Sequence, residues 1–438
     1  MTVRRSSIAL GYLALILAGA VLLDMPWARA SGDYGGFGDA LFTSCSAVCL
    51  TGLSVVDVGA AYTRAGQVVL LALVEVGCLG LMTCGTFLLI AIGRRLSLAR
   101  EFSLMNAYGV AEIRGLRSLI CWVVGSTLAV EGLGALALYL HFHDAYQSVF
   151  FSVMGFCNAG FSLYPDSLAR FQGSPLVVLT LAVETVLGGI GFLVVYNLCT
   201  FRFLRRSSGG KGRLSLHTRV VLRFTAYLLA LALVAFLAVE WNEALAGCPP
   251  WERLYVSFYQ AVTPRTCGFC VVPTESLQPL TRLVYGFLMV VGGAPGSAAA
   301  GVKVTTLAVL LYTLTAMWRG DRETVISQRA VPYDVVRESI VIVMAMLFFI
   351  ALVVAALFAT ERGGPVSSEA LFFEAVSAIT TTGLSVGDTT RRLTAEGRAV
   401  IMVAMFLGRL GALSVVMMIG DREARHLVRY PSEELVVG

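Results

Sequence analysis

The sequence contains few charged residues, and this scarcity argues against a soluble fold. Only 14% of its 438 residues are Asp, Glu, Lys or Arg, whereas 57% are hydrophobic; a soluble domain carries about 25% charged residues. The sequence also lacks a G-x-G-x-x-G nucleotide cradle and an H-E-x-x-H metal-binding pair. Its ten cysteines are scattered through apolar segments and suggest no disulfide framework. We therefore expect an all-α integral membrane protein that is not an enzyme.

What the sequence does contain is one short stretch that occurs four times. Each copy centres on a glycine, at Gly52, Gly160, Gly268 and Gly383, and the intervals are 108, 108 and 115 residues. A regular period predicts four copies of one structural unit. Each glycine follows an amphipathic run too short to span a bilayer, so a unit is predicted as helix, half-helix, glycine turn and helix. The predicted repeats cover residues 1–100, 101–210, 211–325 and 326–438, the last including the C-terminal tail.

The four glycine turns predict a cation filter. Half-helices whose C-terminal ends face one centre would direct partial negative charge toward a cation. Turns beyond them would add a ring of backbone carbonyls, and glycine accepts the φ angles that such turns require. Ordinary turn glycines are the alternative, but they do not explain why the surrounding unit repeats as well. The predicted filter consists of Leu50, Thr51, Gly52, Asn158, Ala159, Gly160, Thr266, Cys267, Gly268, Thr381, Thr382 and Gly383.

An acidic residue follows each of these glycines by five to seven positions. The four residues are Asp57, Asp166, Glu275 and Asp388. A ring of carboxylates at the outer mouth would raise the local concentration of cations. They could equally serve only to keep the loops soluble, and the sequence does not decide between these two interpretations.

The second long helix of each unit carries small residues that would allow close packing in lipid. These helices are expected at about 68–92, 176–198 and 398–418, and only the third unit's helix is predicted to be broken. Its stretch 291–303 contains four glycines and a proline, so we expect a mobile loop across the pore. Arg409, the only charge at its register, is expected to face that pore, or else to be tied to backbone carbonyls or a buried glutamate. The predicted gate comprises Gly292, Gly293, Pro295, Gly296, Ser297, Gly301, Lys303 and Arg409.

Basic residues are unevenly distributed between the loops. They cluster at the N-terminus and at 94–117, 202–223, 319–337 and 422–429, whereas 24–39 and 141–147 are poor in Lys and Arg. The positive-inside rule then places both termini in the cytoplasm and the glycine turns outside. The net charge of +5 therefore reflects topology and gives no indication of nucleic-acid binding. The N-terminus resembles a signal peptide, but its removal would leave the first unit incomplete.

At these residues the chain resembles the Trk/Ktr/HKT superfamily of potassium transporters, and within it the bacterial Ktr-type membrane subunit. The matching segments are 51–57, 158–163, 265–269, 296–303, 382–385, 408–411 and 430–438. The resemblance implies four M1–P-loop–M2 repeats around a single pseudo-fourfold pore, assembled as a homodimer in the cell (inner) membrane. It also implies a separate cytosolic nucleotide-binding regulatory ring, no cofactor in this chain, and Na+ as an activator or symported ion.

The resemblance further implies potassium as the transported ion, bound at the filter carbonyls. In relatives that pass sodium, a serine replaces one filter glycine, and here all four glycines are present. Pro264 and Cys157 depart from the expected pattern beside the filter. The alternatives are a sodium-coupled or sodium-permeable transporter of the same superfamily, a carrier of organic substrates, and a membrane enzyme. A carrier would show inverted repeats, and an enzyme would have to use Glu75, Glu184 or Glu374 with His141 and His143.

Overall fold

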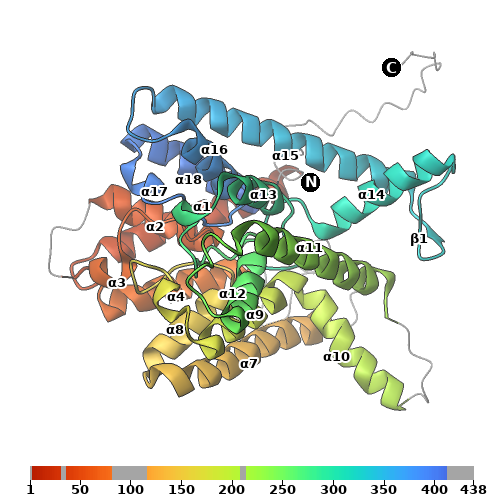
Figure 1. Ribbon diagram of the computed structural model, residues 1–438, viewed down its shortest axis with the longest axis horizontal. Helices are drawn as coiled ribbons and strands as arrows, with labels where there is room; N and C mark the ends of the chain where they lie inside the picture. The colour runs from red at the N-terminus through yellow and green to blue at the C-terminus, as the bar shows by residue number, and fades with distance from the viewer. Residues whose placement is uncertain (1, 31–35, 81–115, 208–213, 412–438) are drawn as a thin grey trace.

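The computed structural model describes residues 2–30, 36–80, 116–207 and 214–411. Residues 94–115 of the predicted basic cluster at 94–117, the cluster at 422–429 and the tail at 430–438 lie outside these residues. Helices dominate the described part of the chain (Figure 1). Its only strands are β1 (Val325–Ile326) and β2 (Arg329–Ala330), which form one short antiparallel hairpin. The expected all-α membrane fold is confirmed.

The first helix of each repeat is long and lies at the periphery. These helices are α1 (Thr2–Asp24), α7 (Leu116–Phe142), α11 (Leu216–Glu240) and α15 (Tyr333–Thr360). In Figure 1, α7 and α15 lie at opposite edges of the molecule. Within the described ranges, Ile120–Phe142, Leu216–Glu240 and Tyr333–Thr360 are long and apolar enough to cross a membrane. Their outward faces carry large apolar side chains, such as Leu133 (69% exposed) and Phe348 (64% exposed), which suits contact with lipid.

The four half-helices lie inside this periphery. They are α2 (Phe37–Cys49), α8 (Ala145–Phe156), α12 (Pro250–Val262) and α16 (Ser368–Ile379). A helix of 12 or 13 residues is about 20 Å long, which is too short for a hydrocarbon core of about 30 Å. Two of these helices begin at a side-chain cap. The Asp144 side chain accepts a hydrogen bond from the Tyr146 amide, and the Ser367 side chain accepts one from the Ala370 amide.

The second helices are interrupted in more than one repeat. They are α4 (Arg64–Leu79), α9 (Pro175–Ile190) with α10 (Phe192–Ser207), α13 (Pro279–Val290) with α14 (Val304–Arg319), and α18 (Ala395–Leu410). The expectation of a single broken helix is wrong, because α9 and α10 meet at an angle of 97°. The bend lies at Gly191, whose φ of +92° is left-handed. Short turns complete the fold: α3 (Val58–Ala61), η1 (Ala169–Phe171), η2 (Thr274–Ser276) and α17 (Thr389–Arg392).

The helices expected at 68–92 and 398–418 also end earlier than predicted. Both α4 and α18 end at a glycine with a positive φ, Gly80 (φ +78°) and Gly411 (φ +82°). Glycine adopts a positive φ without the steric penalty that other residues incur, and its extended ψ here (140° and 136°) ends the helix. Residues 81–92 and 412–418 lie outside the described part of the chain.

Small residues bring the second helices against the ends of the half-helices. A Cβ atom at Gly77 would overlap the carbonyl oxygen of Val48, and one at Gly408 would overlap that of Ile379. A Cβ atom at Gly188 would likewise overlap the carbonyl oxygen of Phe156. Gly188 does so although it lies three residues further from its turn glycine than Gly77 and Gly408 lie from theirs. The contact is therefore kept in three repeats, and it positions each half-helix end at the centre.

We expect Gly408→Ala to destabilise the protein. The added methyl group would collide with a backbone carbonyl that belongs to the buried end of α16, and such overpacking costs about 1–3 kcal/mol. Thermal unfolding in detergent measures the effect. Gly132→Ala on α7 is the matched control, because a Cβ there meets nothing within 4 Å. Equal melting temperatures for the two variants would contradict the close contact.

Candidate cation pathway

The four turn glycines form a closed ring in the order of the repeats. A Cβ atom on Gly52 would meet the carbonyl oxygen of Ala159, and one on Gly160 would meet that of Cys267. Gly268 likewise faces the carbonyl of Thr382, and Gly383 faces that of Thr51. Each repeat therefore presents the carbonyl preceding its glycine to the glycine of the neighbouring repeat. Residues 107 or more positions apart in the sequence meet here.

Alternating backbone conformations orient these carbonyls. The residue two before each glycine is left-handed, with φ between 51° and 76°: Leu50, Asn158, Thr266 and Thr381. The glycines are left-handed as well, with φ between 67° and 86°, and the residue between the two is not. Such alternation turns successive carbonyls toward the same side of the chain. The left-handed non-glycine residues are uncommon backbone positions, and the sequence gives no signal for them.

Hydrogen bonds hold the amides of this ring but leave its carbonyls free. The Thr51 amide donates to the Ser46 carbonyl (2.8 Å) and the Thr382 amide to the Ser377 carbonyl (2.8 Å). The amides of Ala159 and Cys267 likewise donate to carbonyls at the ends of their own half-helices. Within the described residues, no N–H or O–H group donates to the carbonyl of any of these four residues. Buried carbonyls without donors are rare in proteins, and a cation can satisfy them.

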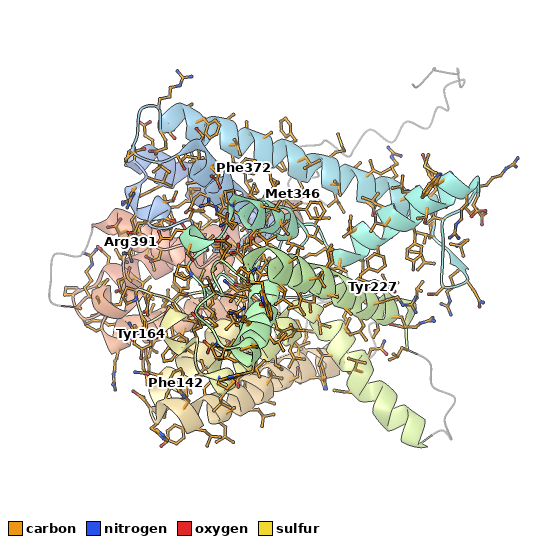
Figure 2. All side chains as sticks on the ribbon, viewed as in Figure 1. Phe142, Tyr164, Tyr227, Met346, Phe372 and Arg391 are labelled. Carbon is orange, nitrogen blue, oxygen red and sulfur yellow. The ribbon has the colours of Figure 1, made fainter. Side chains whose placement is uncertain are left out.

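A cavity of about 400 Å³ opens on one side of the ring. All four glycines line it, as do the four acidic residues predicted for the outer mouth, Asp57, Asp166, Glu275 and Asp388. Arg391 and Arg392 line it too, so four carboxylates face two guanidinium groups. In Figure 2 the labelled Tyr164 and Arg391, which also line this cavity, lie at the end of the molecule that carries α3 and α17.

Three of these acidic residues also have local partners, and one of them, Asp388, pairs with Arg391 (3.8 Å). Asp57 accepts a hydrogen bond from the Gly59 amide (3.0 Å) and caps α3. Arg170 donates to Asp166 (2.9 Å), and this hydrogen bond lowers the pKa of the Asp166 carboxyl below its ordinary value. Asp166 therefore keeps its negative charge as the pH falls further than a free aspartate would.

The non-helical stretch 291–303 lies on the other side, and its backbone is bonded to the second repeat. The Ala294 amide donates to the Gly189 carbonyl (2.9 Å) and the Ala298 amide to the Gly188 carbonyl (3.3 Å). In return, the Phe192 amide donates to the Gly296 carbonyl (3.0 Å). The last carbonyls of a helix lack partners within the helix. Residues 291–303 supply those partners to α9, which explains why the second repeat is broken as well.

Three basic side chains donate to carbonyls of the same stretch. Arg409 on α18 bonds the Ala298 carbonyl (2.7 Å) and also the Gly77 carbonyl on α4. Lys303 bonds the Ala299 carbonyl (2.6 Å). Arg265, which belongs to the matching segment 265–269 but not to the predicted gate, is 8% exposed and donates to the Gly292 carbonyl (3.4 Å). A buried arginine three residues before a turn glycine, in a chain with so few charges, was the available signal.

The buried glutamates brace the half-helices and have no basic partner among the described residues. Glu184 on α9 accepts a hydrogen bond from Ser152 on α8. Glu374 on α16 accepts from Ser385 (2.8 Å) and from Thr390. Neither contacts Arg409 or Lys303, so the expectation that a buried glutamate holds Arg409 is not met, and both glutamates brace their half-helices instead. His141 contacts Ser174 at the surface, and no hydrogen bond joins it to a buried glutamate.

These features define a membrane cation transport protein. The chain belongs to the TrkH family of cation transport proteins, whose family model matches residues 21–423; it is a transporter subunit and not an enzyme. It is 33% identical to Ktr system potassium uptake protein B of Bacillus subtilis, over 98% of this chain and 96% of that protein. It is 31% identical to the potassium/sodium uptake protein NtpJ of Enterococcus hirae, with 98% and 96% covered.

A solved structure supports the same fold. The potassium transporter TrkH from Vibrio parahaemolyticus superposes with a TM-score of 0.76 at 16% identity, covering 96% of this chain and 85% of that chain. The expected family and the expected fourfold arrangement of repeats are thus confirmed. The roles assigned to individual filter, gate and mouth residues stay predictions.

Proposed function

We propose that this chain is the pore-forming subunit of a potassium uptake system and conducts K+ through the ring at Gly52, Gly160, Gly268 and Gly383. The observation that carries the proposal is the set of four ring carbonyls that accept no hydrogen bond. Carbonyl oxygens replace the hydration shell of a cation that has lost its water. The names of the Bacillus and Vibrio relatives, which are potassium transport proteins, support K+ as the ion.

The proposal extends to both sides of the ring. The acidic cavity would concentrate cations before they reach the carbonyls. The stretch 291–303 with Arg409 would act as the gate, because it places basic groups and a closed backbone on the ion's route. Sodium is the second candidate ion, as activator, symported ion or permeant ion, and the name of the Enterococcus relative favours it.

The proposed assembly follows the resemblance of the whole chain to Ktr-type subunits. It is a homodimer in the cell (inner) membrane with both termini in the cytoplasm. A separate cytosolic ring that binds nucleotide would regulate the gate from that side. The relative named for the Ktr system, which covers 98% of this chain, supports such a partner.

Growth rescue tests the proposed function. A bacterium lacking its own potassium uptake is transformed with this chain, alone and with a Ktr-type regulatory subunit, and grown on low potassium with and without sodium. We expect growth at low potassium in the presence of the regulator, and rubidium flux into vesicles that contain both. Absence of rescue and of rubidium flux, with the protein present in the membrane, would contradict the proposal. A strict requirement for sodium would identify it as the coupled or activating ion.

Cysteine labelling tests the orientation. Glu243, after α11, and Glu323, between α14 and β1, are both exposed and lie at opposite ends of the repeat. With a membrane-impermeant maleimide, we expect Glu243→Cys to react in intact cells and Glu323→Cys only after permeabilisation. The parent chain gives the background from its own cysteines. The reverse pattern would overturn the cytoplasmic placement of the basic loops.

A further inference from the structure

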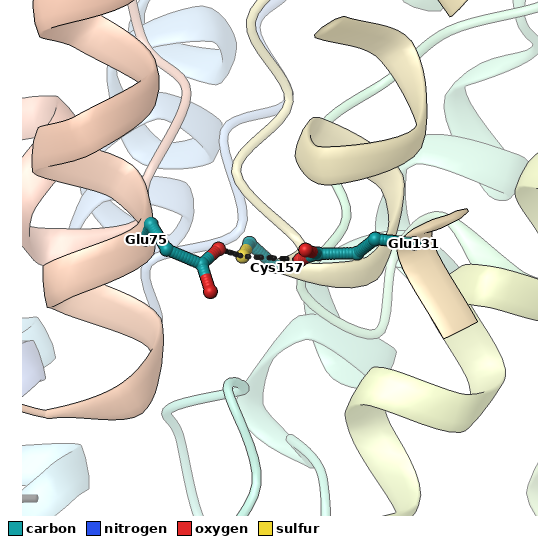
Figure 3. Close-up of side chains that lie close together, drawn as sticks. All are labelled: Glu75, Glu131 and Cys157. Carbon is teal, nitrogen blue, oxygen red and sulfur yellow. Dashed lines mark hydrogen bonds between the residues drawn. The ribbon is translucent and has the colours of Figure 1, made fainter. Parts of the chain in front are cut away.

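Two carboxyl groups and a thiol meet between the first and second repeats, and the proposed function uses none of them. Figure 3 shows Cys157 between Glu75 on α4 and Glu131 on α7. The Cys157 sulfur is 3.3 Å from Glu75 Oε2 and 3.7 Å from Glu131 Oε1. One ligand atom from each residue lies within 4.8 Å of the others. Cys157 is also one of the residues that depart from the expected filter pattern.

The burial of this cluster is costly as long as its carboxylates are charged and no cation is bound. Cys157 is fully buried and Glu131 is 6% exposed. The Oε1 atom of Glu75 is buried and accepts no hydrogen bond. Among the described residues, none of the ion pairs involves either glutamate. Buried carboxylates in proteins are paired with a positive group, coordinate a metal, or hold a proton.

The distances match those of a metal centre. Tetrahedral zinc, with Zn–S about 2.3 Å and Zn–O about 2.1 Å, separates sulfur and oxygen ligands by about 3.6 Å. The observed separations of 3.3 and 3.7 Å fall on either side of this value. We propose that Glu75, Glu131 and Cys157 bind a divalent cation of the zinc class. The combination of thiolate and carboxylate suits such a borderline metal and does not suit K+.

A zinc ion held by three protein ligands takes a water molecule as its fourth ligand. Cys78 lies one turn after Glu75 on α4 and is 4% exposed, but its sulfur is not among the three ligand atoms that lie within 4.8 Å of one another. Glu75 itself is only partly buried and gives access to the cluster. Binding would replace the thiol proton of Cys157 by the metal and release that proton to solvent.

A bound metal would join three helices behind the ring. α4 belongs to the first repeat, whereas α7 and α8 belong to the second. Cys157 directly precedes Asn158, whose left-handed backbone begins the second repeat's part of the ring. The site would therefore hold the second repeat's filter segment against the first repeat. Its predicted consequence is a more stable protein when the metal is present.

Metal titration of the purified full-length protein tests the site. Zn2+ and, as a probe of thiolate ligation, Cd2+ are added to protein in detergent. We expect one tightly bound ion per chain, an ultraviolet Cd–thiolate band, proton release, and a rise of several degrees in Tm. Cys157→Ser should abolish the Cd–thiolate band. Glu131→Gln, which is nearly the same shape as glutamate, should weaken binding about tenfold or more.

Two variants serve as matched controls. Cys49→Ser replaces the thiol at the corresponding position of the first repeat, three residues before its glycine, and Glu374→Gln replaces a buried carboxyl on α16. Both should keep the bound ion and the rise in Tm. The proposal is overturned if Cys49→Ser loses as much binding as Cys157→Ser. It is also overturned if the native protein, eluting as a single species, binds neither ion and shows no change in Tm, because the cluster then holds protons instead.

Discussion

Replacing Gly268 by serine is expected to remove most of the preference for potassium over sodium. Gly268 has a φ of +80°, and its added Cβ would lie 2.8 Å from the carbonyl oxygen of Thr382 and 3.3 Å from the Cα atoms of Gly160 and Gly383. The side chain would therefore displace the ring carbonyls of more than one repeat. We expect the ratio of potassium to sodium flux in vesicles to fall about tenfold or more, which corresponds to about 1.4 kcal/mol.

The matched control for this substitution is Gly286→Ser. Gly286 lies in the same repeat, on α13, and a Cβ there meets nothing within 4 Å. Its ion preference should equal that of the native chain. If Gly268→Ser, present in the membrane in normal amount, also keeps the native preference, the ring at the glycines does not select the ion.

Removing the Arg409 side chain is expected to raise flux in the absence of any regulatory partner. Arg409 donates to the Ala298 carbonyl on the stretch 291–303 and to the Gly77 carbonyl on α4. It thereby joins the proposed gate to two further repeats. A hydrogen bond from a charged group contributes about 1.5–3 kcal/mol, so its loss would favour the open state about tenfold to a hundredfold. The ring carbonyls are untouched, and selectivity should stay that of the native protein.

Deletion of residues 296–300 should also raise flux in the absence of a regulatory partner. It removes the Ala298 carbonyl bonded by Arg409 and the Gly296 carbonyl bonded by the Phe192 amide. Rubidium flux into vesicles without regulator measures both variants. Arg362→Ala, which removes an exposed arginine after α15, is the control for loss of charge. Native flux in both Arg409→Ala and the deletion, at equal expression, would mean that these residues only pack.

Several elements were predictable because their signals are local. The half-helices follow from short amphipathic runs that precede a glycine, and the family follows from motifs that can be read directly. The break at Gly191 was not predictable, because the hydrogen-bond partners of Gly188 and Gly189 come from residues more than 100 positions later. The ends of α4 and α18 were missed since apolar residues continue past Gly80 and Gly411, and hydropathy does not report φ.

Composition and period by themselves determined that this chain lies in a membrane and is built from four similar units. The first property depends on the transfer of apolar residues out of water, and the second depends on a repeated motif. Both the apolar residues and the motif can be read directly from the sequence. Only the tertiary structure decided which groups meet: the carbonyl of Thr51 against Gly383, Arg409 against Ala298, and Cys157 between Glu75 and Glu131. Such contacts depend on how the repeats close around one axis, and no local pattern in the sequence encodes that closure.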